Sequence, residues 1–396
     1  MIDNHTVGLL LNLPTIDVTK VTFTPTEITI SCESKLVCGI CPNCLKNTEK
    51  SHQRSTRTVR DMAIAGRTVY LDLTTRQFHC ADCNRYFYER FNFVEPSKTL
   101  TTRYEKHVYE CCRDSTIERV VVQENVVWET VQEVFTRYAK KETAFLSNYQ
   151  PKRIGLDEFA IKKGHKDFAV TIIDLDKCYA LDVLDFRTKD ELIAYFRAKG
   201  DEYCSKIEVF SCDLWDGFIT TAQMVFPNAD IVPDRFHIFK LLHEVVNKER
   251  KKLRKQYPED DELKSIKWLL FKSWDKLSYE QRRLLLRAFR KSENLRKLYW
   301  LKQELRNIFE TECTKEIAEK HLLAWIEEAK ILKHNVLNTF IKTVTKHFKN
   351  ILNFFTHRVS NGIVEGINNV IKAIKRQGFG FRNFENFKLK IQLKFI

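Results

Sequence analysis

Three acidic residues lie far apart in the chain, and each has surroundings suited to metal-dependent chemistry. Asp157 lies in an alternating apolar segment that predicts a strand, and Asp213 follows a second apolar segment that ends there. Glu365 lies in a segment with helical periodicity. Open α/β sheets bind ligands at their strand ends, and carboxylates from separate elements can hold a divalent cation against a phosphate. Taken singly, each acid is more often a solvated surface charge.

The neighbours of these acids predict which side chains can reach such a site. Glu158 follows Asp157 directly, and on a strand their side chains point to opposite faces, so only one can face a given site. Around Glu365, one helix face is predicted to be buried and comprises Ile363, Ile367, Val370, Ile371 and Ile374. A separate face is polar and comprises Glu365, Asn368, Asn369, Lys372 and Arg376.

Asp234 and His237 form a further candidate catalytic pair. A histidine can orient a phosphate or an attacking water, and a carboxylate can fix its tautomer. Asp234 could equally cap the helix that follows it, with His237 packed alongside. The sequence leaves both interpretations open.

The cysteines predict a structural zinc site. Cys41 and Cys44 form one C-x-x-C pair, and Cys80 and Cys83 form another. Two such pairs can close a tetrahedral four-thiolate site. The segment between the pairs is long for a zinc ribbon, so we expect an inserted hairpin, for which the alternating residues 67–76 are suited. Cys38 and His52 remain alternative ligands.

Apolar stripes predict a helical region between about residues 101 and 143. The first stripe is Ile117, Val120 and Val121, and the second is Val127, Val131, Val134, Phe135 and Tyr138. Two short helices with a tight turn fit a helix-turn-helix whose second helix enters a major groove. Outward glutamates such as Glu129 weaken this interpretation, and any two packed helices would show such stripes.

The charge distribution indicates a polyanionic partner. The formal net charge is +14, from 66 Lys and Arg against 52 Asp and Glu, and residues 241–396 carry most of the surplus. Cations that neutralise DNA phosphates release counterions and add affinity. The alternative is that the surface lysines serve solubility alone. The residues that we expect to contact DNA are Arg137, Lys140, Lys251, Lys252, Arg254, Lys372, Arg376 and Arg382. Arg282, Arg283, Arg287 and Arg290 suggest a further phosphate-binding face.

The composition is that of a globular protein with 43% hydrophobic residues. No segment has the length and apolar character of a membrane span, and the N-terminus does not resemble a secretory signal. We therefore expect a cytoplasmic, nucleoid-associated protein whose cysteines are thiols or metal ligands.

Together these motifs resemble the ISL3 family of bacterial insertion-sequence transposases along almost the whole chain. The resemblance rests on the cysteine pairs and on segments 59–61, 87–91, 155–160, 234–237, 357–358, 360–362, 364–366 and 380–384. It implies a multidomain α/β protein: a zinc-binding β module (1–95), a helix-turn-helix (96–150), an RNase H-like mixed-sheet catalytic core (151–240), a helical insertion (241–350) and a C-terminal part of the core that carries the glutamate (351–396).

The resemblance also implies a chemistry. Asp157, Asp213 and Glu365 match the acidic triad of DDE transposases, which holds two Mg²⁺ or Mn²⁺ ions about 3.5–4 Å apart. The implied reaction is cleavage of DNA at terminal inverted repeats and strand transfer to target DNA. The implied assembly is a homodimer or higher oligomer on double-stranded DNA.

Two other functions remain open at this stage. One is a metal-dependent, structure-specific DNA nuclease that performs no strand transfer. The other is a DNA-binding regulator with a zinc finger and a helix-turn-helix but an inactive catalytic domain. The presence of all three acids counts against the regulator.

Overall fold

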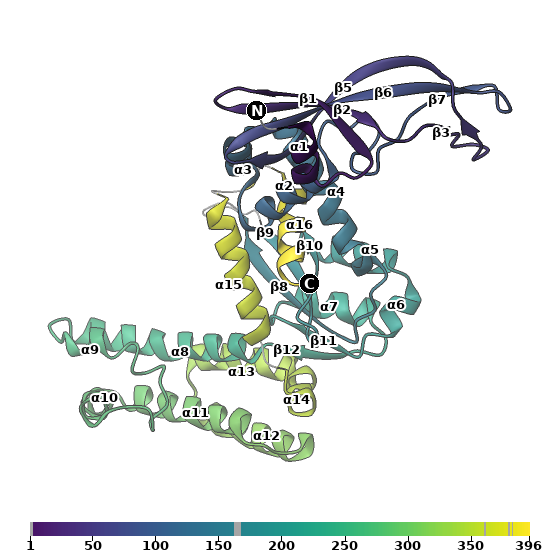
Figure 1. Ribbon diagram of the computed structural model, residues 1–396. Helices are drawn as coiled ribbons and strands as arrows, with labels where there is room; N and C mark the ends of the chain where they lie inside the picture. The colour runs from purple at the N-terminus through teal and green to yellow at the C-terminus, as the bar shows by residue number, and fades with distance from the viewer. Residues whose placement is uncertain (1–2, 162–167, 360–361, 379–380, 382) are drawn as a thin grey trace. The chain divides into compact units, whose positions relative to one another are not determined.

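The computed structural model describes residues 3–161, 168–359, 362–378, 381 and 383–396 (Figure 1). The chain forms two compact units, Met1–Lys141 and Glu142–Ile396. Four residues of the sequence motifs lie outside the described residues: Ser360, Asn361, Gly380 and Arg382. The finer five-part division stays a prediction.

The first unit is built on a sheet with the strand order β1-β2-β6-β5, in which β7 also pairs with β6. The long antiparallel hairpin of β5 and β6 is the insertion expected between the cysteine pairs, and it turns at Ala65 and Gly66, which both have positive φ. The elements are α1 (Asn4–Leu11), β1 (Ile16–Phe23), β2 (Glu27–Ser34), β3 (Gly39–Ile40), β4 (Asn47–Thr48), β5 (Ser51–Ile64), β6 (Arg67–Cys80) and β7 (Arg85–Tyr88).

The same unit continues into the expected helical region. Thr101 and Thr116 cap α2 and α3 by accepting hydrogen bonds from backbone N–H groups of their first turns. Asn125 ends α3 in the left-handed conformation, and a short turn leads into α4. The bounds are α2 (Thr102–Asp114), α3 (Ile117–Glu124) and α4 (Trp128–Thr143), followed by the 3₁₀ helix η1 (Ala144–Ser147). The prediction of two helices joined by a tight turn is confirmed.

The second unit contains a mixed sheet with the order β10-β9-β8-β11-β12. Strand β8 pairs antiparallel with β9 and parallel with β11, and β11 pairs parallel with β12. The strands are β8 (Arg153–Ala160), β9 (Phe168–Asp174), β10 (Ala180–Leu184), β11 (Val209–Cys212) and β12 (Asp230–Pro233). The strand that contains Asp157 and the apolar segment that ends at Asp213 were both expected from the sequence.

The sheet separates two hydrophobic cores because side chains alternate along each strand. On one face, Ile154 and Leu156 pack with α5 (Lys189–Ala198), α6 (Asp201–Ser205) and α7 (Asp216–Val225). On the other face, Phe159 packs in the core that includes α15 (Gly362–Gln377) and α16 (Phe384–Lys394). Since Asp157 alternates in step with Phe159, its side chain lies on the α15 face.

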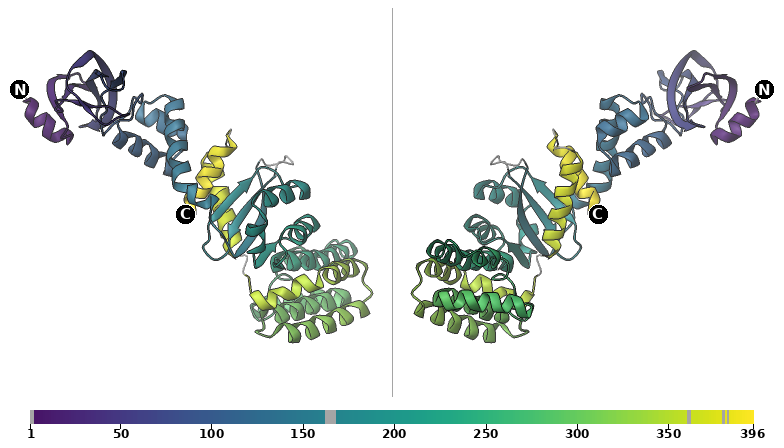
Figure 2. Two further views of the ribbon diagram at one scale, coloured as in Figure 1. Left: turned by 90° about the vertical axis from the view of Figure 1, so that its right-hand side faces the viewer. Right: turned by 90° about the vertical axis from the view of Figure 1, so that its left-hand side faces the viewer.

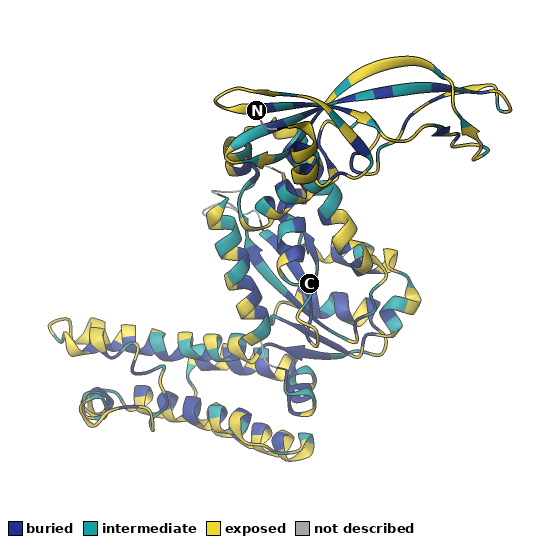
Figure 3. Cartoon of the chain, in the orientation of Figure 1, coloured by how far each residue is buried: buried dark blue, intermediate teal, exposed yellow. Residues whose placement is uncertain are grey.

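A run of helices connects β12 to α15 and shares the second core (Figure 2). These helices are α8 (Arg235–Gln256), α9 (Glu262–Ser265), α10 (Tyr279–Lys291), α11 (Glu293–Glu310), α12 (Lys315–Ile331), α13 (Asn335–Lys346) and α14 (Phe348–His357). Their buried residues face one another and their exposed residues face outward (Figure 3). Within the described part of the chain, no helix is long and apolar enough to cross a membrane.

Candidate functional site

Asp157 and Asp213 come together because their strands are neighbours. The parallel register of β8 and β11 pairs Gly155 with Ser211. Asp157 and Asp213 each lie two residues further along, so the period of two places their side chains on the same face of the sheet. Both carboxylates are half-buried. Glu158 points the opposite way and forms an ion pair of 2.7 Å with Arg187, as the alternation predicted for one of the two acids.

The electrostatics of this pair favour a cation. Burial, and then the negative charge of Asp213, raise the pKa of Asp157 to about 7. Burial and the neighbouring negative charge thus both disfavour the ionised form of Asp157. Hard divalent cations bind carboxylate oxygens and would offset this repulsion. The side chains present thus fit a divalent metal ion.

Asp234 and His237 join the site from the start of α8. The Oδ1 atom of Asp234 accepts a hydrogen bond of 2.8 Å from the backbone N–H of Phe236, so Asp234 caps this helix. The His237 ring nitrogen Nε2 lies 2.8 Å from Oδ1 of Asp213 but 3.9 Å from the carboxylate of Asp234. One ligand atom from each of Asp213, Asp234 and His237 lies within 4.8 Å of the others.

This geometry changes the expected roles of the pair. The sequence left open whether Asp234 fixes the ring of His237 or caps the helix. Asp234 caps the helix, and Asp213 is the nearer carboxylate partner of His237. Burial works against the charged ring, yet the contact with Asp213 outweighs it and raises the pKa of His237. A sequence motif that contains both Asp234 and His237 could not reveal this partner, because Asp213 lies on another element.

The helix that carries Glu365 packs against the strand that carries Asp157. The side-chain amide of Asn368 donates a hydrogen bond to Asp157 Oδ2. Glu365 lies three residues earlier, about 4.5 Å along the helix axis, and its side chain is exposed. Neither Glu365 nor Asp157 belongs to the cluster of Asp213, Asp234 and His237 described above.

The faces of α15 differ from those expected in two respects. Asn368 was expected on the polar face, but it is only 5% exposed, and its Oδ1 atom has no hydrogen-bond partner among the described residues. Val364 is buried although it was not expected to be. The reason is that residues 364, 367, 368 and 371 form the stripe that faces the sheet. Asn368 is thus a site residue whose role the helical pattern alone did not reveal.

The four expected cysteines form one cluster in the first unit. Sulfur atoms of Cys41, Cys44, Cys80 and Cys83 all lie within 4.8 Å of one another. Leu45 and Asn84 have positive φ directly after the two pairs, as tight knuckle turns require. Hydrogen bonds from the backbone N–H groups of Cys44 and Asn43, in the first turn, lower the pKa of the Cys41 thiol to about 7. This arrangement fits a structural Zn²⁺ ion.

The two alternative zinc ligands are not part of this cluster. Cys38 lies outside the group of four sulfurs. The His52 ring packs against Tyr86 instead, with 4.8 Å between the ring centroids.

The residues expected to contact DNA differ in whether their charges are already paired with acids of the protein. Arg137 forms ion pairs with Glu105, Glu133 and Glu95 at 2.7, 3.0 and 3.8 Å, so its charge is already balanced inside the first unit. The remaining described candidates are exposed: Lys140, Lys251, Lys252, Arg254, Lys372 and Arg376.

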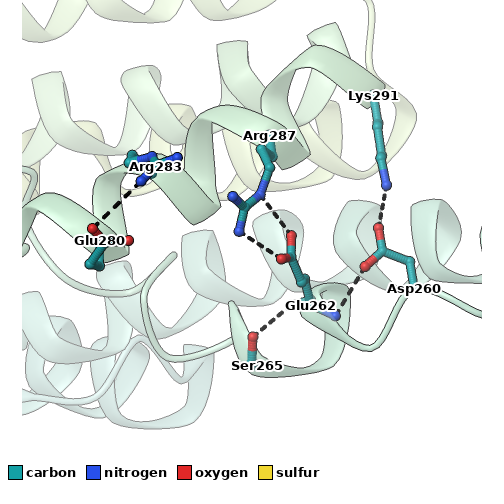
Figure 4. A network of polar contacts seen from close by, with 7 residues as sticks. All are labelled: Asp260, Glu262, Ser265, Glu280, Arg283, Arg287 and Lys291. Carbon is teal, nitrogen blue, oxygen red and sulfur yellow. Dashed lines mark hydrogen bonds and ion pairs between the residues drawn. The ribbon is translucent and has the colours of Figure 1, made fainter.

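Cations on α10 are also paired within the protein (Figure 4). Arg287 makes two hydrogen bonds to Glu262, and Lys291 forms an ion pair with Asp260. Arg283 lies 3.6 Å from Glu280. Of the four arginines expected to form a phosphate-binding face, Arg283 and Arg287 are therefore paired with neighbouring acids.

Comparison with known proteins identifies the chain. Residues 154–391 match the family model of the ISL3 transposase domain, described as a transposase, and residues 39–83 match the zinc finger of the transposases of IS204, IS1001, IS1096 and IS1165. The chain is 27% identical over 363 residues to the transposase for insertion sequence element IS1001 of Bordetella parapertussis, covering 90% of this chain and 88% of that protein.

A second relative is the transposase for insertion sequence element IS1557 of Mycobacterium tuberculosis. It is 24% identical over 284 residues, which cover 65% of this chain and 63% of that protein. The family match spans both β8, which carries Asp157, and α15, which carries Glu365. The chain therefore belongs to the ISL3 family of DDE insertion-sequence transposases, a family of enzymes.

Proposed function

We propose that this transposase binds the terminal inverted repeats of its insertion sequence and catalyses Mg²⁺-dependent DNA cleavage and strand transfer. Asp157, Asp213 and Glu365 are the proposed metal-binding acids. The observation that carries the proposal is the convergence of Asp157 and Asp213 on one face of the sheet, with the helix of Glu365 hydrogen-bonded to Asp157 through Asn368.

The topology of the second unit supports an RNase H-like catalytic core. Three antiparallel strands are followed by two strands parallel to the first, and the helices 235–357 lie between the last strand and the helix of Glu365. This order agrees with a core interrupted by a helical insertion before the third acid. The site acids then come from β8, from the end of β11 and from α15.

Each residue of the site has a distinct role in the proposal. Divalent cations, when bound, supply the Lewis acidity that activates water or a 3′-hydroxyl and stabilises the leaving oxygen. Asp157 and Asp213 would hold such cations, and Asn368 orients Asp157. His237 is held by Asp213 and could orient the scissile phosphate or the attacking water, while Asp234 anchors the start of α8. Glu365, exposed on α15 three residues before Asn368, would complete the ligand set.

DNA binding is assigned to both units. In the first unit, α3 and α4 are proposed to act as a helix-turn-helix and the four-cysteine module to hold structural zinc. In the second unit, the exposed cations of α8 and α15 would neutralise phosphates without reading sequence. We further propose that two or more copies assemble on the paired transposon ends.

The test uses two DNA substrates that carry a terminal repeat, one intact and one with a pre-cleaved 3′ end. Wild-type protein should cleave the first and join the second to target DNA in Mg²⁺ or Mn²⁺. Asp157→Asn, Asp213→Asn and Glu365→Gln should abolish both reactions while repeat binding persists. Asp201→Asn and Glu385→Gln, at exposed acids of the same unit, serve as controls.

The outcomes separate the alternatives. Cleavage without joining of the pre-cleaved end would favour a structure-specific nuclease. Repeat binding with neither reaction would favour an inactive regulator. Full activity of Glu365→Gln would remove that residue from the metal site.

A further inference from the structure

A second cluster of potential metal ligands lies in the first unit, apart from the four cysteines. It consists of His107 and Cys111 on α2 and Glu124 at the end of α3, and one ligand atom from each lies within 4.8 Å of the others. The His107 ring nitrogen Nε2 is 3.0 Å from Glu124 Oε1 and 3.7 Å from the Cys111 sulfur. All three side chains are partly exposed, so an ion could reach them from solvent.

The local sequence explains why these groups meet. His107 and Cys111 are four residues apart on one helix, so their side chains lie on the same face. Glu124 is the last residue of α3, directly before the left-handed Asn125 that ends the helix. The end of α3 therefore places the Glu124 carboxylate beside His107 and Cys111 on α2.

The surrounding contacts hold the carboxylate in place. Tyr104 donates a hydrogen bond of 3.0 Å to Glu124 Oε2, which leaves Oε1 directed toward His107. Such outer contacts are how proteins orient metal ligands. Arg60 lies nearby, but its guanidinium donates to the backbone carbonyls of Glu124 and Asn125 and stacks over the Tyr104 ring, so it does not form an ion pair with the carboxylate.

We propose that His107, Cys111 and Glu124 form a second zinc site, with a water molecule or exogenous ligand at the fourth position. Imidazole, thiolate and carboxylate are the three ligand types that Zn²⁺ accepts, and a tetrahedral ion separates its ligand atoms by about 3.3–3.8 Å. Two observed separations, 3.0 and 3.7 Å, are close to this range and the third lies within 4.8 Å, so side-chain movements on the order of 1 Å would suffice. The ion would clamp α2 to the end of α3, immediately before the turn into α4.

This site should differ from the four-cysteine site in affinity. It offers one thiolate instead of four and is open to solvent, so its zinc should exchange more readily. The bound ion would link α2 to the end of α3 in the folded state only. Zinc binding should therefore stabilise the first unit by mass action. Neither property depends on catalysis or on DNA.

The test measures zinc in the purified full-length chain. All chains in this test carry Asp213→Asn and His237→Ala, so that the proposed cation site of the second unit holds no zinc. After equilibration with excess ZnCl₂ and desalting, elemental analysis should give two zinc ions per chain for the wild-type first unit. Cys111→Ser and Glu124→Gln should each retain one ion, in the four-cysteine site. Cys178→Ser, at an exposed thiol of the second unit, should retain two ions.

Thermal unfolding provides a second readout. Added ZnCl₂ should raise the melting temperature of the wild type but not that of Cys111→Ser or Glu124→Gln once the four-cysteine site is full. One zinc ion per chain in the wild type, or two in both variants, would overturn the proposal. The single ion that each variant keeps reports that its first unit is folded, so a lost second ion is not due to misfolding.

Discussion

Asn368 on α15 donates a hydrogen bond to Asp157 on β8, and this contact ties the helix of Glu365 to the strand of the first proposed catalytic acid. The two residues are distant in the chain, and the contact buries an amide that a helical pattern assigns to the polar face. Its position makes Asn368 a positioning residue for the proposed metal site.

Replacing Asn368 should therefore impair cleavage without impairing DNA binding. Asn368→Ala removes the donor that orients Asp157, and loss of such an outer contact to a metal ligand typically costs about 10–100-fold in metal affinity or activity. Cleavage rates measured across a Mg²⁺ titration should show a weaker apparent affinity for the metal. The control is Asn369→Ala, because the neighbouring Asn369 is exposed. Equal Mg²⁺ dependence in both variants would contradict the positioning role.

Asp234 should contribute to stability through its cap on α8. Asp234→Ala removes the oxygen that accepts from the Phe236 N–H, and loss of such a cap costs about 0.5–2 kcal/mol. Asp234→Asn keeps an oxygen acceptor and removes one negative charge beside Asp213. Urea unfolding should therefore rank the alanine variant below the asparagine variant. Equal free energies of unfolding for the alanine and asparagine variants would show that Asp234 does not stabilise the protein through its helix cap.

Lys302 should make stability depend on pH. Its side chain is fully buried, and burial lowers its pKa to about 7, with the charge of Arg306 as a second cause. The unfolded chain holds this proton up to its ordinary pKa of 10.5, whereas the folded chain releases it near pH 7. Between these values the unfolded state binds more protons, so the Lys302 contribution to the free energy of unfolding rises with pH.

The test compares Lys302→Met with the wild type at pH 7 and pH 9. The variant loses donors to the carbonyls of Leu270 and Lys272, so it should be less stable at both values. Its deficit should be larger at pH 9, because the wild type gains stability there and the variant does not. A deficit that is equal at both values would show that Lys302 does not release its proton on folding.

Exposed cations of α8 should bind DNA phosphates, whereas the paired cations of α10 should not. Each phosphate contact adds about 0.9 to the slope of log affinity against log salt concentration. Replacing Lys251, Lys252 and Arg254 with Gln should lower that slope by about 1–3. The control has the same change in net charge and replaces Arg283, Arg287 and Lys291, which already form ion pairs with acids. Equal slopes for the two triple variants would contradict the assignment.

The sequence by itself correctly predicted the features that depend only on the spacing of nearby residues. Two C-x-x-C pairs predicted the four-cysteine cluster because each pair needs only a tight turn, and alternation predicted the strands because the side-chain period of a strand is two. The same rule separated Asp157 from Glu158. The ISL3 resemblance, carried by short motifs along the chain, is confirmed by the family match.

Only the tertiary structure decided which distant side chains meet. Strand pairing brought Asp157 to Asp213, the docking of α8 gave His237 the partner Asp213, and the docking of α15 buried Asn368. Folding likewise matched Arg137 and Arg287 to acids on other elements. These contacts could not be predicted from the sequence, because a residue's type limits the partners it can accept while the packing of whole elements determines which partner is within reach.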